Sequence, residues 1–216
     1  AALRPGRGGT LSAIGMLADG LLAGTITHPA LSTASLRQSL PRFTLTSPAT
    51  AGANFEHAGQ HLLMTRGDMA GIGGFGYMVV FSVDGSNSSR RGFIGMRGSA
   101  TNWSGTTFAP NGVALCVGVG FDAASHTTYQ IAHSAHSNNS GSYVDTGIPL
   151  SNPESVLELK LSCPPNGDAI AWSLKDLTSG ASASGAISSN IPNKQTFYSH
   201  RVRMDNNGVA AAVSCD

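Results

Sequence analysis

The stretch SVLELKLSC, residues 155–163, decides the fold class of this 216-residue chain. Its three leucines alternate with a glutamate and a lysine, and a period of two places the leucines on one face of a β-strand and the charges on the other. AIAWSLK, residues 169–175, alternates in the same way, and the intervening PPNGD contains Asn166-Gly167, a strong hairpin signal. Together the two stretches predict an antiparallel hairpin with one buried face and one solvated face.

The rest of the chain reads as further strands separated by turns. Glycine accounts for 27 residues and charged residues for only 12%, a composition that favours turns and opposes long helices. Short, evenly spaced strands without a helical period are typical of sandwiches and jelly rolls. We therefore predict an all-β fold, an antiparallel β-sandwich or jelly roll, with further strands at residues 75–84, 91–99, 113–121, 126–134 and 197–205.

Two of these strands carry more detailed predictions. FGYMVVFSVD, residues 75–84, is apolar on both faces, as expected of a central strand. VALCVGVGF, residues 113–121, places its large apolar side chains on one face and Cys116, Gly118 and Gly120 on the other. A face so bare predicts that another group approaches it closely, either from this chain or from a neighbouring subunit.

The pattern changes near residue 40. Residues 1–40 show no clear period and are predicted to form an N-terminal linker segment, whereas residues 41–216 form the β-sandwich domain. The apolar residues 11–26 follow two arginines, as in a signal peptide, but Asp19 interrupts them and they are too short to span a bilayer. We expect this stretch to be part of the folded structure, with no membrane insertion.

The charge pattern argues against a nucleic-acid partner. The formal net charge is +1, and the longest run of basic residues is the pair Arg90-Arg91. A nucleic-acid binder normally shows a basic stripe with interleaved aromatic residues.

Metal and cofactor sites also lack support. Cys116, Cys163 and Cys215 are far apart and include no C-x-x-C pair, so we expect buried free thiols, with one disulfide left open. The seven histidines include no H-x-H pair, and His133 and His136 would face opposite sides of a strand. No metal and no other cofactor is predicted.

Catalytic motifs are missing as well. The chain contains no G-x-S-x-G nucleophile turn. Its only glutamates are Glu56, Glu154 and Glu158, and they do not form the E-x-D-x-x-E strand of sandwich-type glucanases. We therefore predict no catalytic residues and a protein that is not an enzyme; a site assembled from distant residues or shared between subunits stays open.

Two polar loops have the character of a sugar-binding surface, in which an aromatic side chain lies among short polar ones. The alternative for the first loop is that Trp103 packs on the core or on a neighbouring subunit. The basic pair at residues 90–91 would suit an acidic sugar, although an exposed turn explains it equally well. The candidate glycan-binding residues are Asn102, Trp103, Asn138, Asn139, Tyr143, Arg90 and Arg91.

The order of several motifs resembles a known family. GGFGYMVVF is followed by RRGFIGMRGS, NGVALCVGVGFD, YVDTGIPL, ELKLSCPPNGDAIAWSL and IPNKQTFYSHRVRMDNNGVAAAV. This order resembles the jelly-roll domains in the distal regions of tailed-bacteriophage tail fibres and tailspikes, with VGVGFD and CPPNG as the most specific anchors. The resemblance covers residues 41–216.

The resemblance implies a concanavalin-like β-sandwich, assembled as a homotrimer on a virion, that attaches to host surface polysaccharide. No residue-level binding motif comes with it. The family continues beyond the position of residues 214–216 with one more alternating strand, which this sequence lacks; a truncated fragment and a strand supplied by another chain both fit. Two alternatives are a structural virion protein that contacts other virion proteins but no receptor, and a polysaccharide depolymerase.

Overall fold

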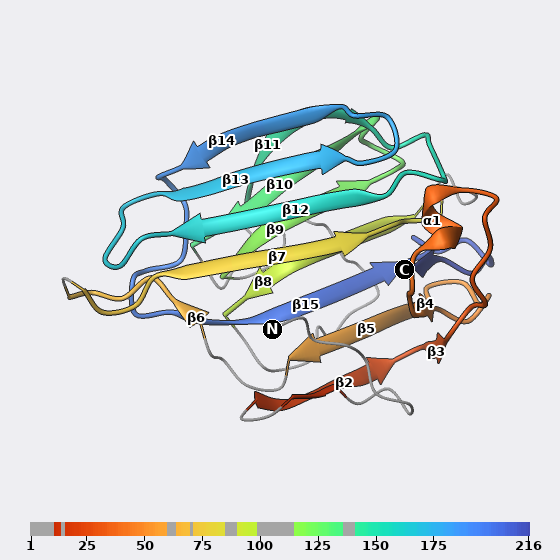
Figure 1. Ribbon diagram of the computed structural model, residues 1–216, viewed down its shortest axis with the longest axis horizontal. Helices are drawn as coiled ribbons and strands as arrows, with labels where there is room; N and C mark the ends of the chain where they lie inside the picture. Colours follow the sequence, from red (N-terminus) through yellow and green to blue (C-terminus); the bar gives the residue numbers. More distant parts are fainter. Residues whose placement is uncertain are drawn as a thin grey trace.

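The computed structural model describes residues 11–13, 16–59, 64–69, 71–84, 90–98, 115–135 and 141–216. Within these residues the chain is built almost entirely of strands, with one helix of a single turn (Figure 1). The elements are β1 (Leu11–Ala13), β2 (Met16–Ala23), β3 (Thr25–Thr27), α1 (Leu36–Ser39), β4 (Thr44–Thr46), β5 (Asn54–Gly59), β6 (Met64–Thr65), β7 (Phe75–Phe81), β8 (Arg91–Arg97), β9 (Cys116–Asp122), β10 (Thr128–Ser134), β11 (Ser142–Pro149), β12 (Leu157–Cys163), β13 (Ile170–Asp176), β14 (Ser182–Ile187), β15 (Phe197–Asp205) and β16 (Ser214–Cys215).

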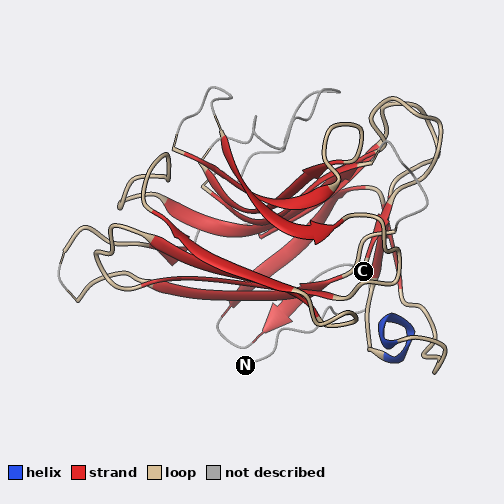
Figure 2. Ribbon diagram, turned by 90° about the horizontal axis from the view of Figure 1, so that it is seen from above, coloured by secondary structure: helices blue, strands red, loops and turns tan. Residues whose placement is uncertain are grey.

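The strands form two main sheets and one small one. The nine-stranded sheet has the order β1-β2-β5-β15-β8-β9-β10-β11, with β6 also paired to β15. The four-stranded sheet has the order β14-β13-β12-β7, and β16-β4-β3 form the small sheet. All pairings are antiparallel, and the two main sheets lie in layers (Figure 2). The predicted all-β sandwich is confirmed.

The core lies between the two main sheets. The leucines of β12 and Tyr198, Val202 and Met204 of β15 belong to one buried cluster. Arg201 and Arg203 alternate with these residues and therefore point to the opposite side of the nine-stranded sheet. We call that side, which turns away from the four-stranded sheet, the outer face of the nine-stranded sheet.

The predicted hairpin is β12 and β13. Leu159 lies opposite Leu174, and both are buried, whereas Lys160 lies on the solvated side. Asn166 takes a left-handed backbone conformation with φ 56°, and the N–H of Gly167 donates to the carbonyl of Pro164, which closes the turn. The register and the wet face thus follow from the alternation in the sequence.

The prediction of a central strand at residues 75–84 is wrong. β7 is the last strand in the order of the four-stranded sheet, and β12 is its only partner in that order. Its outward side chains are apolar but exposed: Met78 is 62% exposed and Val80 is 43% exposed. The strand has apolar residues on both faces, but only one of these faces is buried.

The bare face of β9 is approached closely, as predicted, and the approaching groups come from the neighbouring strand β8. A Cβ atom added to Gly118 would lie 2.5 Å from the carbonyl oxygen of Ile94 and 2.9 Å from the ring of Phe93. The ring of Phe93 is fully buried with Cys116 and Ala132 in a small second cluster on the outer face. Glycine is therefore needed here for close approach within one chain.

Part of the predicted linker segment belongs to the sandwich. β2 pairs with β5 at the edge of the nine-stranded sheet, and β3 pairs with β4 in the small sheet. No helix in the described part of the chain is long and apolar enough to cross a membrane.

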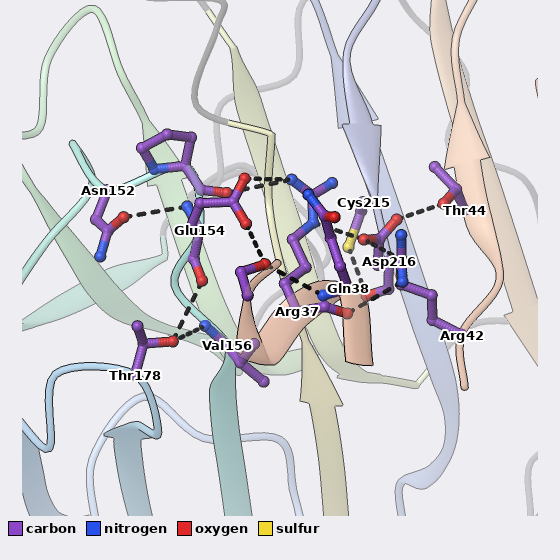
Figure 3. Close-up of polar contacts among 12 residues, drawn as sticks. Arg37, Gln38, Arg42, Thr44, Asn152, Glu154, Val156, Thr178, Cys215 and Asp216 are labelled. Atoms are coloured by element: carbon purple, nitrogen blue, oxygen red, sulfur yellow. Dashed lines mark hydrogen bonds and ion pairs between the residues drawn. The ribbon is translucent and has the colours of Figure 1, made fainter. Parts of the chain in front are cut away.

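A polar cluster ties α1 to the end of the sandwich (Figure 3). Ser35 caps the helix by accepting the N–H of Gln38, and its hydroxyl donates to Glu154 at 2.7 Å. The buried carboxylate of Asp216 contacts Arg37 Nε at 2.6 Å and Arg42 Nε at 3.0 Å. The other oxygen, Oδ1, accepts from the hydroxyl of Thr44, so the carboxylate links segments that are far apart in the sequence.

The three cysteines are free and buried, as predicted. Burial raises the pKa of the Cys116 and Cys215 thiols far above their usual range. These thiols are therefore unreactive packing groups.

Candidate functional site

The structure places only some of the predicted glycan-binding residues. Asn102, Trp103, Asn138 and Asn139 lie outside the described residues. Tyr143 lies in β11, at the edge of the nine-stranded sheet, and its side chain is on the outer face, where it packs against the small cluster around Phe93.

Arg90 and Arg91 are buried, although both interpretations of this pair, an acidic-sugar contact and an exposed turn, require exposure. Arg90 is buried and donates from Nη2 to the carbonyl of Leu150 at 2.6 Å. Arg91 is buried in β8, where its Nε contacts Asp205 Oδ1 at 3.0 Å. Both guanidinium groups already have acceptors inside the protein, because a buried cation requires them. Arg90 and Arg91 are therefore not surface cations that could contact an acidic sugar.

One end of the outer face carries a buried charge network. Arg201 Nη1 lies 2.7 Å from Glu56 Oε1, and Arg203 Nη1 lies 3.7 Å from Glu56 Oε2. Arg91 and Asp205 form the neighbouring pair on β8 and β15. We call these five residues the charge network. All five are buried and are paired with one another, so they offer little to a ligand.

The opposite end of the same face holds a half-buried aromatic pair. The rings of His126 and Tyr143 meet edge to face, with centroids 5.0 Å apart and planes at 79°. The N–H of Asp122 donates to His126 Nδ1 at 3.2 Å. Because Nδ1 accepts, the neutral ring carries its proton on Nε2, which is a hydrogen-bond donor.

A fixed carboxylate lies beside this pair. Asp145 follows Tyr143 by two residues on the same face of β11, a separation of about 7 Å along the strand. Its Oδ1 accepts three hydrogen bonds, from the hydroxyl of Thr128 at 2.7 Å, the N–H of Gly147 at 2.9 Å and the amide of Gln130 at 3.3 Å. Asp145 is exposed, and the hydrogen bonds that it accepts from the described residues all reach Oδ1 and not Oδ2. We call His126, Thr128, Gln130, Tyr143 and Asp145 the aromatic–carboxylate site.

The hydrogen bonds reinforce the negative charge that an exposed aspartate carries at neutral pH. The N–H of Gly147 and the hydroxyl of Thr128 are the main causes that lower the pKa of Asp145 below its usual value. Asp145 is therefore ionised at neutral pH and presents a preoriented acceptor to solvent. Together with the His126 donor and the Tyr143 ring, it offers the three kinds of contact that a sugar needs.

The sequence carries a signal for this site in the alternation of β10 and β11. Thr128 and Gln130 alternate along β10, as Tyr143 and Asp145 do along β11, so each pair shares one face. What the sequence cannot supply is the register, which places Gln130 directly opposite Asp145.

The glutamates pair with basic residues, and the described residues form no metal-binding cluster. Each glutamate forms an ion pair with a basic side chain: Glu56 pairs with Arg201, Glu154 with Arg37, and Glu158 with Lys160. Within the same part of the chain, no three His, Cys, Asp or Glu side chains come close enough to share a metal ion.

The fold has relatives among solved structures. A peanut lectin in complex with a nine-residue peptide superimposes with a TM-score of 0.57 and 11% identity over 91% of this chain and 90% of its own. A legume lectin-like domain from Entamoeba histolytica gives 0.57 and 9% over 88% and 85%, and a basic winged bean lectin with Tn-antigen gives 0.51 and 12% over 91% and 92%.

The chain has a legume-lectin-like β-sandwich fold. No protein-family model matches the sequence, and no curated protein matches it. At 9–12% identity the likeness establishes architecture alone. The concanavalin-like sandwich implied by the sequence resemblance is thus confirmed, and function has to be argued from the site itself.

Proposed function

We propose that this domain binds a carbohydrate at the aromatic–carboxylate site. The observation that carries the proposal is the exposed carboxylate of Asp145, fixed by three donors beside the His126–Tyr143 pair. Sugar recognition combines an apolar ring contact with a few oriented polar groups. The lectin-like fold is compatible with this role.

We further propose that the domain attaches a virion to its host. The support is the resemblance of residues 41–216 to distal tail-fibre and tailspike domains of tailed bacteriophages. The partners would then be a host surface polysaccharide and, within a homotrimer, two further copies of the chain. In this proposal the protein is extracellular and part of the virion, and it acts by holding a surface without catalysis.

An array of bacterial surface polysaccharides tests the binding function. We expect the wild-type chain to bind at least one glycan, and His126→Ala to weaken that binding because the variant removes one ring and one donor. His28→Ala, which changes an exposed histidine outside the site, is the matched control. Failure of the full chain to bind any glycan would overturn the proposal. Light scattering of the intact protein tests the homotrimer, which a monomer would contradict.

The second candidate is a structural virion protein without a receptor. The exposed side chains of Met78 and Val80 on the edge strand β7 favour it, because an apolar sheet edge is suited to protein contacts. Under this alternative, Met78→Lys would impair virion assembly, and His126→Ala would have no effect on host adsorption.

A further inference from the structure

We propose that the aromatic–carboxylate site selects uncharged sugars with adjacent hydroxyl groups and rejects hexuronates, with Asp145 as the residue that sets this preference. The inference rests on the proposed glycan-binding function and specifies the class of ligand. Its argument combines the charges around the site with the hydrogen-bonding capacity of Asp145.

The charges that surround the site favour a ligand without an anionic group. Asp145 and Asp122 place two carboxylates at this end of the outer face. The register puts Arg91 opposite Asp122, but its guanidinium contacts Asp205 and is buried. Arg90, beneath the turn after β9, is buried and donates to the carbonyl of Leu150.

The remaining arginines of this face do not change the balance. Arg97, Arg201 and Arg203 are buried, and Arg201 and Arg203 share the carboxylate of Glu56. A uronate carboxylate would therefore meet like charge at Asp145, and no arginine of this face in the described part of the chain has an exposed guanidinium to offset it.

The hydrogen-bonding capacity of the site matches hydroxyl groups. Oδ1 of Asp145 is occupied by Thr128, Gln130 and Gly147, so it holds the carboxylate in one orientation. The hydrogen bonds from the described residues all reach Oδ1, which leaves Oδ2 of the exposed Asp145 as an acceptor for a ligand, and Nε2–H of His126, in the ring beside Tyr143, is the donor. A sugar hydroxyl both donates and accepts, so two adjacent hydroxyls can use this pair of groups together.

Asp145→Asn isolates the effect of the open oxygen. The amide oxygen of asparagine can accept the same three hydrogen bonds, so the local structure is preserved. Its NH₂ group then replaces an acceptor with a donor at the position that faces the ligand. Asp168→Asn is the matched control, because Asp168 is also an exposed carboxylate with an ordered partner, Lys194, in a different loop.

The experiment is an NMR titration of the full chain with matched ligand pairs: the methyl glycosides of galactose, glucose and mannose, and the corresponding methyl hexuronides. We expect signals of β10 and β11 to shift with at least one neutral glycoside. The corresponding hexuronide should bind at least about tenfold more weakly. Asp145→Asn should weaken neutral binding about tenfold and reduce the discrimination, whereas Asp168→Asn should leave both unchanged. Thermal melting checks that each variant is folded.

The outcomes separate this inference from the function on which it rests. Equal or tighter binding of the hexuronide would overturn the ligand class and leave glycan binding intact. Neutral binding that persists unchanged in Asp145→Asn would overturn the role of this residue. If neither ligand series nor the polysaccharide array shows binding by the wild-type chain, the proposed function fails, and the inference fails with it.

Discussion

The two ends of one sheet face differ in a way that separates structure from function. The charge network and the aromatic–carboxylate site both lie on the outer face of the nine-stranded sheet, and both are built from polar side chains on neighbouring strands. In the first, the carboxylates of Glu56 and Asp205 are buried and contact arginines. In the second, Asp145 is exposed, and the hydrogen bonds from the described residues reach only one of its two oxygens.

The difference teaches that a cluster of charges on a strand face is not in itself a binding site. A buried pair must satisfy its own members, because desolvation costs several kcal/mol per ion. An exposed carboxylate whose orientation is fixed retains capacity for a ligand. Burial and unused hydrogen-bonding capacity therefore decide which end of the face can bind.

The largest expected effect comes from breaking the charge network. Glu56→Ala leaves Arg201 and Arg203 buried without their shared carboxylate, and should lower the free energy of unfolding by about 3–5 kcal/mol. Urea denaturation measures this change. Lys160→Ala, which breaks the more exposed Glu158–Lys160 pair on the four-stranded sheet, is the control and should cost about 1 kcal/mol or less. Equal losses of unfolding free energy in the two variants would refute the distinction between buried and exposed ion pairs.

The sandwich could be predicted from sequence because its clearest strands report burial directly. In β12 and β13 the alternation of leucine with charged or small residues identifies the core face. In β7 the same logic fails, since Met78 and Val80 are apolar yet exposed, and only strand order reveals an edge. Apolar residues on both faces cannot distinguish a central strand from an edge strand whose outer side chains happen to be apolar.

The candidate site was predictable only in part. Tyr143 could be chosen because an aromatic residue beside a polar loop suggests a sugar contact. Arg90 and Arg91 were misplaced because their acceptors, Leu150 and Asp205, are 60 and 114 residues away. Asp145 is not among the candidates predicted from the sequence, because its bonds to β10 depend on the register between two strands.

The next largest effect is the loss of stability at low pH from two histidines beside the charge network. His57 and His200 lie on the core side of β5 and β15, next in sequence to Glu56 and Arg201. Burial, reinforced by Arg201, lowers the pKa of His57 to about 4. Burial, reinforced by His57 and Arg201, lowers the pKa of His200 to about 3.

The unfolded chain binds these two protons near pH 6.5, whereas the folded chain does not, so stability falls as the pH drops below 6.5. Each histidine contributes about 1.4 kcal/mol per pH unit, and the free energy of unfolding should be about 3 kcal/mol lower at pH 5.5 than at pH 7.5 from this source. His57→Leu should reduce the pH slope by about one proton, and His28→Leu, at an exposed position, should not. An unchanged slope in His57→Leu would contradict the assignment.

A smaller effect probes the seam between the two ends, where β8 and β9 approach. Gly118→Ala places a methyl group 2.5 Å from the backbone oxygen of Ile94, which cannot move without disturbing the sheet. We expect a loss of about 1–3 kcal/mol in unfolding free energy. Gly76→Ala on β7 is the control, because a Cβ there meets no atom within 4 Å and should be neutral or stabilising by up to about 1 kcal/mol. A neutral Gly118→Ala would mean that the sheet relaxes locally.

The smallest effect concerns the aromatic–carboxylate site alone. Thr128→Val removes the 2.7 Å hydrogen bond to Asp145 while nearly preserving side-chain volume. The pKa of Asp145 should rise toward its usual value, because a main cause of its lowering is lost. Glycan affinity should fall about three- to tenfold, since the carboxylate is then less well oriented. NMR titration measures the pKa, and the same sample gives the affinity. If affinity falls while the pKa of Asp145 stays unchanged, Thr128 contacts the ligand itself. If the pKa rises without loss of affinity, the orientation of Asp145 is irrelevant to binding. The contrast between the charge network and the aromatic–carboxylate site would then have no functional meaning.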